Sequence, residues 1–119
     1  MQVRCTLRTR AQYSLVYDSG RTWLNSLVVV KALPNQLGVT RLGFSVGKKI
    51  GKAVVRNRVR RLLKEVTRAL RIKPGWDIIF IARKSAATAD YHQLKKAIGG
   101  LLLRAGLLDE NETANIMAD

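Results

Sequence analysis

The sequence predicts a single α+β domain, because three segments have helical periodicity, three have strand patterns, and 119 residues suffice for one ordinary domain. Apolar residues make up 47% of the chain, which is typical of a globular protein with one modest core. We expect one folded unit over residues 1–108 and an acidic, mobile tail over residues 109–119.

Apolar residues at helical spacing predict three helices. The first spans Thr9 to Asp18 and precedes the stop signal Gly20. The second runs from about residue 53 to residue 70, and the third follows Thr88 as its N-cap and ends at Gly106. The expected buried stripes are Tyr13, Val16 and Tyr17; Val55, Val59, Leu62, Val66 and Leu70; and Tyr91, Leu94, Ile98, Leu101, Leu102 and Ala105.

Three further segments have the composition of strands. Residues 23–33 are rich in β-branched and large apolar side chains, with room for a shorter strand at their start, and residues 41–46 alternate as a half-buried strand does. We expect these two segments to form an antiparallel hairpin. Residues 76–82 are almost continuously apolar, which predicts a central strand covered on both faces.

The positive charge is large and uneven. The formal net charge is +14, and residues 1–108 hold all 22 bases but only four of the eight acids, a surplus of +18. A small fold tolerates such self-repulsion best when a polyanion is its normal partner, so nucleic acid is the expected ligand.

Cys5 is the only cysteine, and no apolar core of a secretory signal follows the first residues, which together favour the cytoplasm.

Half of the bases gather between Lys48 and Lys73, where eleven basic residues meet one acid, Glu65. On the second helix, one set of bases repeats every four residues and forms a continuous ridge opposite the apolar stripe. The members of this basic ridge are Lys52, Arg56, Arg60, Lys64 and Arg68, with Asn57 and Arg61 beside them. Arginine donates bidentate hydrogen bonds to phosphate and stacks on bases, whereas lysine acts as a point charge.

Three alternatives explain the ridge less well. An ordinary solvated face carries acids among its bases, a membrane-surface helix carries Trp, Phe or Leu for insertion, and a DNA-binding protein shows a helix-turn-helix or minor-groove arms.

The glycine-flanked turn 45–51 before the helix adds backbone amides that face an anion. Folded RNA is therefore the favoured ligand.

Residues 41–68, RLGFSVGKKIGKAVVRNRVRRLLKEVTR, resemble the signature region of the bacterial ribonuclease P protein. The core pattern Lys-Lys-x-Gly-x-Ala-Val-x-Arg-Asn is reproduced from Lys48 onward, and a weaker resemblance covers nearly all the chain up to the acidic tail. The resemblance implies an α-β-β-β-α-β-α sandwich, similar to the ribosomal protein S5 domain 2-like fold, with a left-handed β-α-β crossover.

The resemblance also implies roles for individual residues. The contacts to the catalytic RNA fall on Lys48, Lys49, Lys52, Arg56, Asn57, Arg58, Arg60, Arg61 and Lys64. A cleft between the first helix and the sheet holds the 5′ leader of precursor tRNA, which assigns Tyr13, Tyr17 and Lys31 to leader binding; core packing is an equal reading of the two tyrosines. The strand Val28-Val29-Val30-Lys31 is aliphatic where relatives often carry an aromatic ring.

The protein side chains suggest no catalytic centre of their own. Asp18, Glu65, Asp77 and Asp90 are scattered singly, and His92 has no ligand-spaced partner, so we expect neither catalytic residues nor a metal site in the protein. The family chemistry is phosphodiester hydrolysis by the RNA subunit with bound magnesium ions, so the implied function is that of a ribonuclease P subunit. A purely structural RNA-binding module that resembles a ribosomal protein is the alternative. No membrane and no obligate protein partner is expected.

Overall fold

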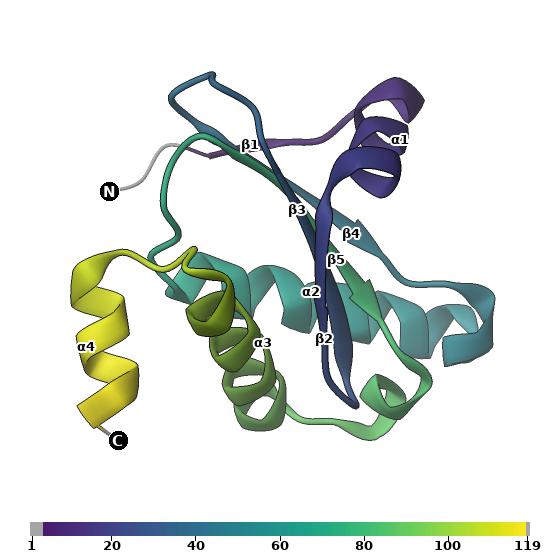
Figure 1. Cartoon of the computed structure of the whole chain (residues 1–119). Helices are drawn as coiled ribbons and strands as arrows, with labels where there is room; N and C mark the ends of the chain where they lie inside the picture. Colours follow the sequence, from purple (N-terminus) through teal and green to yellow (C-terminus); the bar gives the residue numbers. More distant parts are fainter. Residues whose placement is uncertain (1–3, 119) are drawn as a thin grey trace.

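The computed structural model describes residues 4–118, and side chains through residue 114. Figure 1 shows one mixed sheet with helices on both of its faces. The elements in chain order are β1 (Arg4–Thr6), α1 (Arg10–Ser19), β2 (Arg21–Leu24), β3 (Val28–Pro34), β4 (Thr40–Ser45), the 3₁₀ turn η1 (Lys48–Ile50), α2 (Ala53–Ala69), β5 (Trp76–Ala82), the 3₁₀ turn η2 (Lys84–Thr88), α3 (Tyr91–Ala105) and α4 (Glu110–Ala118). In the described chain, no helix has the length and apolarity needed to cross a bilayer.

The strand order in the sheet is β1-β4-β5-β3-β2. β2 and β3 are antiparallel neighbours, so the region predicted as residues 23–33 is two strands joined by a short turn. The predicted hairpin between this region and β4 is wrong. β5 lies between β3 and β4, antiparallel to β3 and parallel to β4. In this central position its apolar side chains are covered on both faces of the sheet.

β5 is the central strand that its sequence predicts. Ile78, Ile79 and Phe80 are all fully buried, which requires one layer of helices on each side of the sheet. β4 and β5 are parallel, and α2 connects them, so the expected β-α-β crossover is present. This connection fixes α2 against one face of the sheet.

Different helices pack on the two faces of the sheet. α2 and α3 cover one face, where the main core joins residues such as Val30, Phe80 and Leu63. α1 covers the other face through a smaller cluster of Leu7, Val16 and Ile79. Figure 1 shows α1 on the opposite side of the sheet from α2 and α3, which confirms a three-layer α+β sandwich.

Capping side chains set where the helices begin. Thr9 accepts a hydrogen bond from the Gln12 amide while the Gln12 side chain returns to Thr9, which is a capping box at α1. The prediction of Thr88 as the N-cap of α3 is wrong, because Asp90 forms the same reciprocal pair with Gln93 two residues later. Gly106 ends α3 with φ of 72°, a left-handed conformation that favours glycine.

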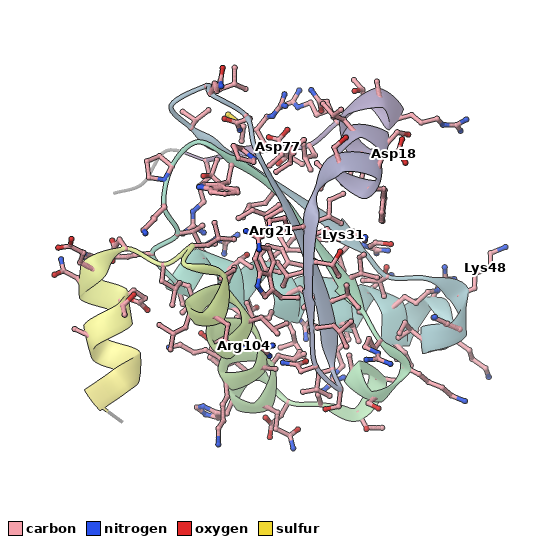
Figure 2. The ribbon with its side chains drawn as sticks, viewed as in Figure 1. Asp18, Arg21, Lys31, Lys48, Asp77 and Arg104 are labelled. Carbon is pink, nitrogen blue, oxygen red and sulfur yellow. The ribbon has the colours of Figure 1, made fainter. Side chains whose placement is uncertain are left out.

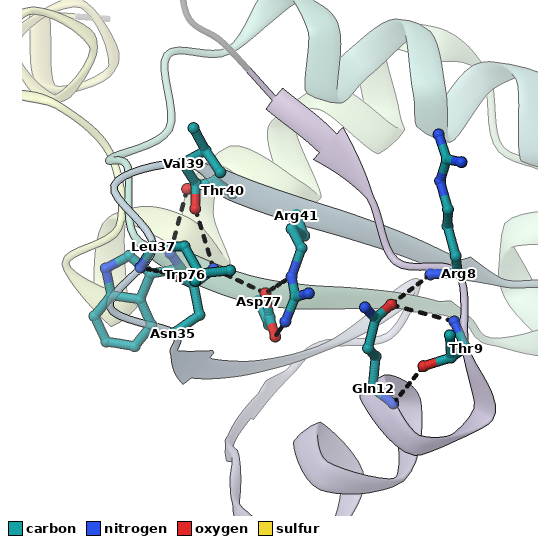
Figure 3. A network of polar contacts seen from close by, with 10 residues as sticks. All are labelled: Arg8, Thr9, Gln12, Asn35, Leu37, Val39, Thr40, Arg41, Trp76 and Asp77. Atoms are coloured by element: carbon teal, nitrogen blue, oxygen red, sulfur yellow. Dashed lines mark hydrogen bonds and ion pairs between the residues drawn. The ribbon is translucent and has the colours of Figure 1, made fainter.

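Asp77 anchors the sheet through a buried polar network (Figure 3). Its carboxylate accepts bonds from Arg41 Nε at 2.7 Å and Nη2 at 2.6 Å, and from Asn35 Nδ2 at 2.8 Å. The side chain of Asp77 is only 3% exposed, so these donors replace the water that burial removes. The network joins the start of β4 to the start of β5.

Two elements were not predicted. β1 adds a short parallel edge strand beside β4, and its residue Arg4 donates to the backbone oxygens of Thr67 and Leu70 at the end of α2. The acidic tail contains α4, begun by the Asp109 carboxylate, which accepts the Glu112 amide at 2.8 Å. The expectation that this tail is mobile stays a prediction.

Candidate nucleic-acid interface

α2 places its apolar and basic residues on opposite sides. Val59 and Val66 are fully buried against the sheet and α3, as the helical spacing predicts, and Leu63, outside the predicted stripe, is fully buried with them. Along the basic ridge, Arg56 and Arg60 are half-buried, whereas Lys52, Lys64 and Arg68 are exposed. The ridge therefore lies deepest at Arg56 and Arg60 and reaches solvent at both ends.

The outer side of α2 is hollowed into a shallow groove of about 320 Å³. Its lining residues are Asn57, Arg60, Arg61, Lys64, Glu65 and Arg68. Arg60 Nη1 donates to Asn57 Oδ1 at 3.0 Å, which holds one guanidinium edge in place. The groove thus presents several cationic donors, one of them oriented by Asn57, around one small hollow.

The ridge is poorly neutralised by the protein itself. Among the described residues, ion pairs join Arg61 to Glu65, at 3.9 Å between Nε and Oε1, and Arg41 to Asp77. Both partners of the first pair are well exposed, so it contributes little to stability. The Nε of Arg56 is buried without a hydrogen-bond partner in the described structure. Like charges four residues apart destabilise a helix by about 0.2–0.5 kcal/mol a pair, and a bound polyanion reverses that effect.

Arg58 differs from the other predicted RNA-binding residues. Its guanidinium donates to the backbone oxygens of Ala87, at 3.2 Å, and Ala89, at 2.8 Å. These oxygens belong to η2 and to the residue that ends it, Ala89. The structure therefore gives Arg58 a bracing position between α2 and η2, which the spacing of bases alone does not reveal.

The turn before α2 gathers three further lysines. Lys48 and Lys49 are exposed on η1, and Lys48 projects into solvent at the right of Figure 2. Lys52 is the N-cap of α2, and no side chain caps the helix amides there. The Ile50 and Gly51 amides bond within the turn, so the amides expected to face an anion are those of the first turn of α2.

The predicted leader residues lie on the other face of the sheet. Tyr13 packs in the α1 cluster with its ring directly over Gly43, where a Cβ would lie 2.7 Å from the hydroxyl oxygen. Tyr17 is 39% exposed one turn later in α1. Lys31 Nζ donates to Thr22 Oγ1 at 3.0 Å. Tyr13 is thus largely a packing residue, while Tyr17 and Lys31 keep exposed surface.

An open strip of sheet continues from these residues. Leu24, Val29 and Ile81 are register partners across β2, β3 and β5, on the same face as Lys31. Leu24 is 52% exposed, and Val29 and Ile81 are partly exposed. The sheet therefore offers partly exposed aliphatic side chains on this face, as the aliphatic strand sequence indicates.

Two bases extend the cationic surface beyond the residues to which the resemblance assigns RNA contacts. Arg68 belongs to the basic ridge by its spacing, although the resemblance gives it no contact. Arg71 follows the helix and is exposed next to the same surface. No spacing rule reaches Arg71, because it lies beyond the end of α2.

A comparison with protein families matches the family described as Ribonuclease P over residues 1–106. This chain belongs to the ribonuclease P protein family. The Ribonuclease P protein component of Dehalococcoides mccartyi is 45% identical over 114 residues, which are 95% of each chain. That of Caldanaerobacter subterraneus is 45% identical over 108 residues, which cover 89% of this chain and 93% of the relative.

Solved ribonuclease P proteins also share the fold. A mutant of the Staphylococcus aureus protein superposes with a TM-score of 0.80 at 30% identity, over 88% of this chain and 89% of that chain. The Thermotoga maritima protein gives a TM-score of 0.77 at 31% identity, over 83% and 96%. The family match includes the whole basic ridge and ends before α4. The predicted family and its sandwich fold are therefore confirmed.

Proposed function

We propose that this chain binds the ribonuclease P catalytic RNA through α2 and holds the 5′ leader of precursor tRNA on the opposite sheet face. Membership of the ribonuclease P family makes it the protein subunit of an endoribonuclease that matures tRNA 5′ ends. The observation that carries the assignment of surfaces is the weakly neutralised basic ridge, which lies wholly within the matched region.

The ridge suits a folded RNA because it combines exposed cations with two half-buried arginines, Arg56 and Arg60. Arg60 is oriented by Asn57, and bidentate donation from such a group fits a phosphate well. The buried Nε of Arg56 gains an acceptor if phosphate draws the guanidinium outward. Lys48, Lys49 and Lys52 extend the surface toward the N-terminus of α2, where the helix dipole also favours an anion.

The leader surface suits an unpaired strand. Tyr17 offers a partly exposed ring for stacking on a base, which contributes about 1–3 kcal/mol per base in single-strand binding. Lys31 offers a cation on the same face of the sheet as Val29, and Leu24 and Val29 provide aliphatic contacts without sequence preference. Tyr13 contributes by setting the distance of α1 from the sheet at Gly43.

Phosphodiester hydrolysis is assigned to the RNA subunit and to magnesium ions held by the RNA and the substrate. Among residues 4–114, no three His, Cys, Asp or Glu side chains gather as a metal site would need. The part we assign to the protein is electrostatic: it neutralises crowded phosphates and holds the leader in one orientation, which lowers the magnesium concentration that the complex requires.

The test is cleavage of precursor tRNA by its cognate catalytic RNA at limiting magnesium, with and without this protein. We expect faster cleavage with the wild-type chain and a smaller gain with Arg56→Gln/Arg60→Gln. The matched control is Arg104→Gln, which removes an exposed arginine at the end of α3. RNA binding without any effect on cleavage would instead indicate a structural RNA-binding module.

A further inference from the structure

A large cavity lies beside the C-terminal half of α2, at the edge of the sheet. Its volume is about 850 Å³, within the range of small-molecule sites in proteins. β1 and β4 form one wall, and α2 with the residues after it forms the other. The groove on the outer side of α2 shares Lys64 and Arg68 with this cavity, so the two hollows form one continuous cationic surface.

The interior of the cavity is apolar and partly aromatic. Leu42, Leu70 and the half-buried Phe44 line it. The Phe44 ring stacks on the buried Phe80 ring, with centroids 5.7 Å apart and planes inclined by 19°. The ring is therefore held in a fixed plane by the core while part of it remains accessible in the cavity.

Cations surround this apolar interior. Lys64, Arg68 and Arg71 are exposed side chains of the cavity lining, and Asp109 is the one acid there. Arg4 also lines the cavity, and its bonds to the carbonyl oxygens of Thr67 and Leu70 tie β1 to the end of α2. Those bonds keep the two walls together, so the cavity does not depend on a ligand to hold its shape.

From this arrangement we infer that the cavity receives one unpaired nucleotide of the catalytic RNA. The base enters against Phe44, and the adjoining phosphates lie on Lys64, Arg68 and Arg71. Recognition of RNA bases outside the duplex commonly combines aromatic stacking with cationic contacts to the backbone, and this cavity holds both. A base inside a duplex could not enter the cavity, because its stacked neighbours would hold it in place. The inference rests on the proposed function and adds the kind of RNA element that α2 engages.

The Cys5 side chain lies beside Arg41, on the other face of the sheet from Leu42 and Phe44. The probe is therefore a thiol at Thr6, which is exposed, lines the cavity and is the register partner of Leu42. The variant Cys5→Ser/Thr6→Cys, whose single thiol is this one, is treated with iodoacetamide, alone and in complex with its catalytic RNA, and alkylation is followed by mass spectrometry. We expect the RNA to slow alkylation about tenfold, which corresponds to a free-energy difference of about 1.4 kcal/mol. The protection should disappear at high salt, where the complex dissociates.

A photo-crosslinker attached to the single thiol of this variant then identifies the neighbouring nucleotide. We expect a dominant crosslink to one unpaired position of the RNA. Crosslinks confined to base-paired segments would overturn the inference. So would alkylation at the rate of the free protein in a complex that is fully formed and stimulates cleavage. Failure to bind or stimulate the catalytic RNA at all would instead contradict the proposed function.

Variants test the same site without a label. Arg68→Gln/Arg71→Gln should lower the slope of log affinity against log salt by about two, one for each phosphate contact. Phe44→Leu keeps an apolar side chain and the cations, so it should weaken binding while leaving this slope unchanged. The matched control for the arginines, Arg104→Gln, should leave RNA affinity unchanged. Equal affinity and salt slope for the double variant and the wild type would refute the phosphate contacts.

Discussion

The carboxylate of Asp77 is the group whose removal should most destabilise the fold. Substitution by alanine removes three acceptor contacts, two with Arg41 and one with Asn35. It also leaves the Arg41 guanidinium, whose side chain is 22% exposed, without its anion. Removing one partner of a buried ion pair costs about 3–5 kcal/mol, and partial access of water to Arg41 favours the lower end of that range.

We therefore expect Asp77→Ala to reduce the free energy of unfolding by about 3 kcal/mol. For a domain of this length that corresponds to a fall in Tm of roughly 10 °C. Equilibrium urea denaturation followed by circular dichroism measures the first quantity, and a thermal scan measures the second. Asp18→Ala is the control, because this exposed carboxylate on α1 should change stability by less than about 0.5 kcal/mol.

A double variant separates the ion pair from simple loss of packing. Arg41→Met/Asp77→Leu leaves no unpaired charge, and Asn35 keeps its bond to the Val39 carbonyl oxygen at 3.0 Å. The double variant should therefore be more stable than Asp77→Ala alone. The reasoning about the buried charge is refuted if Asp77→Ala lowers the free energy of unfolding by less than about 1 kcal/mol. It is also refuted if the loss in the double variant equals the sum of the losses measured for Arg41→Met and Asp77→Leu alone.

Two further substitutions test how α1 and α2 are positioned. Gly43→Ala places a methyl group 2.7–2.8 Å from the hydroxyl and ring atoms of Tyr13, which should cost about 1–3 kcal/mol in urea denaturation and weaken the preference for precursor over mature tRNA. With Tyr13→Ala added, the combined loss should be smaller than the sum of the two single losses, and additive losses would contradict the steric account. Arg58→Met removes the bonds to the η2 carbonyl oxygens, which should cost about 1–2 kcal/mol without changing the salt slope of RNA binding. A fall of one unit in that slope would instead place Arg58 on the RNA.

The sequence predicts the elements well wherever one periodicity dominates a long segment. α2 and β5 have nearly the predicted bounds, because a one-sided apolar stripe fits only a helix and a continuous apolar run fits a buried strand. Strand neighbours are less accessible to such reasoning. β3 and β4 look like a hairpin from their proximity in sequence, yet the later strand β5 lies between them, since pairing depends on the whole core.

The candidate site likewise has features that the sequence predicts and features that it does not. The spacing of bases on α2 predicts the ridge and its separation from the apolar stripe. It does not predict that Arg58 faces η2, because a residue at the flank of a helix turns toward whatever the tertiary structure packs beside it. The cavity was also inaccessible from sequence, since Arg4 and Arg71 reach it from separate segments that only the folded sheet brings together.

The central claim is that the basic ridge of α2 neutralises phosphates of folded RNA. The most direct measurement is the salt dependence of the Kd for the catalytic RNA, compared between the wild-type chain, Arg60→Gln and Arg104→Gln. The claim predicts that Arg60→Gln alone lowers the slope by about one and weakens binding at low salt. Identical slopes and affinities for all three proteins would contradict it.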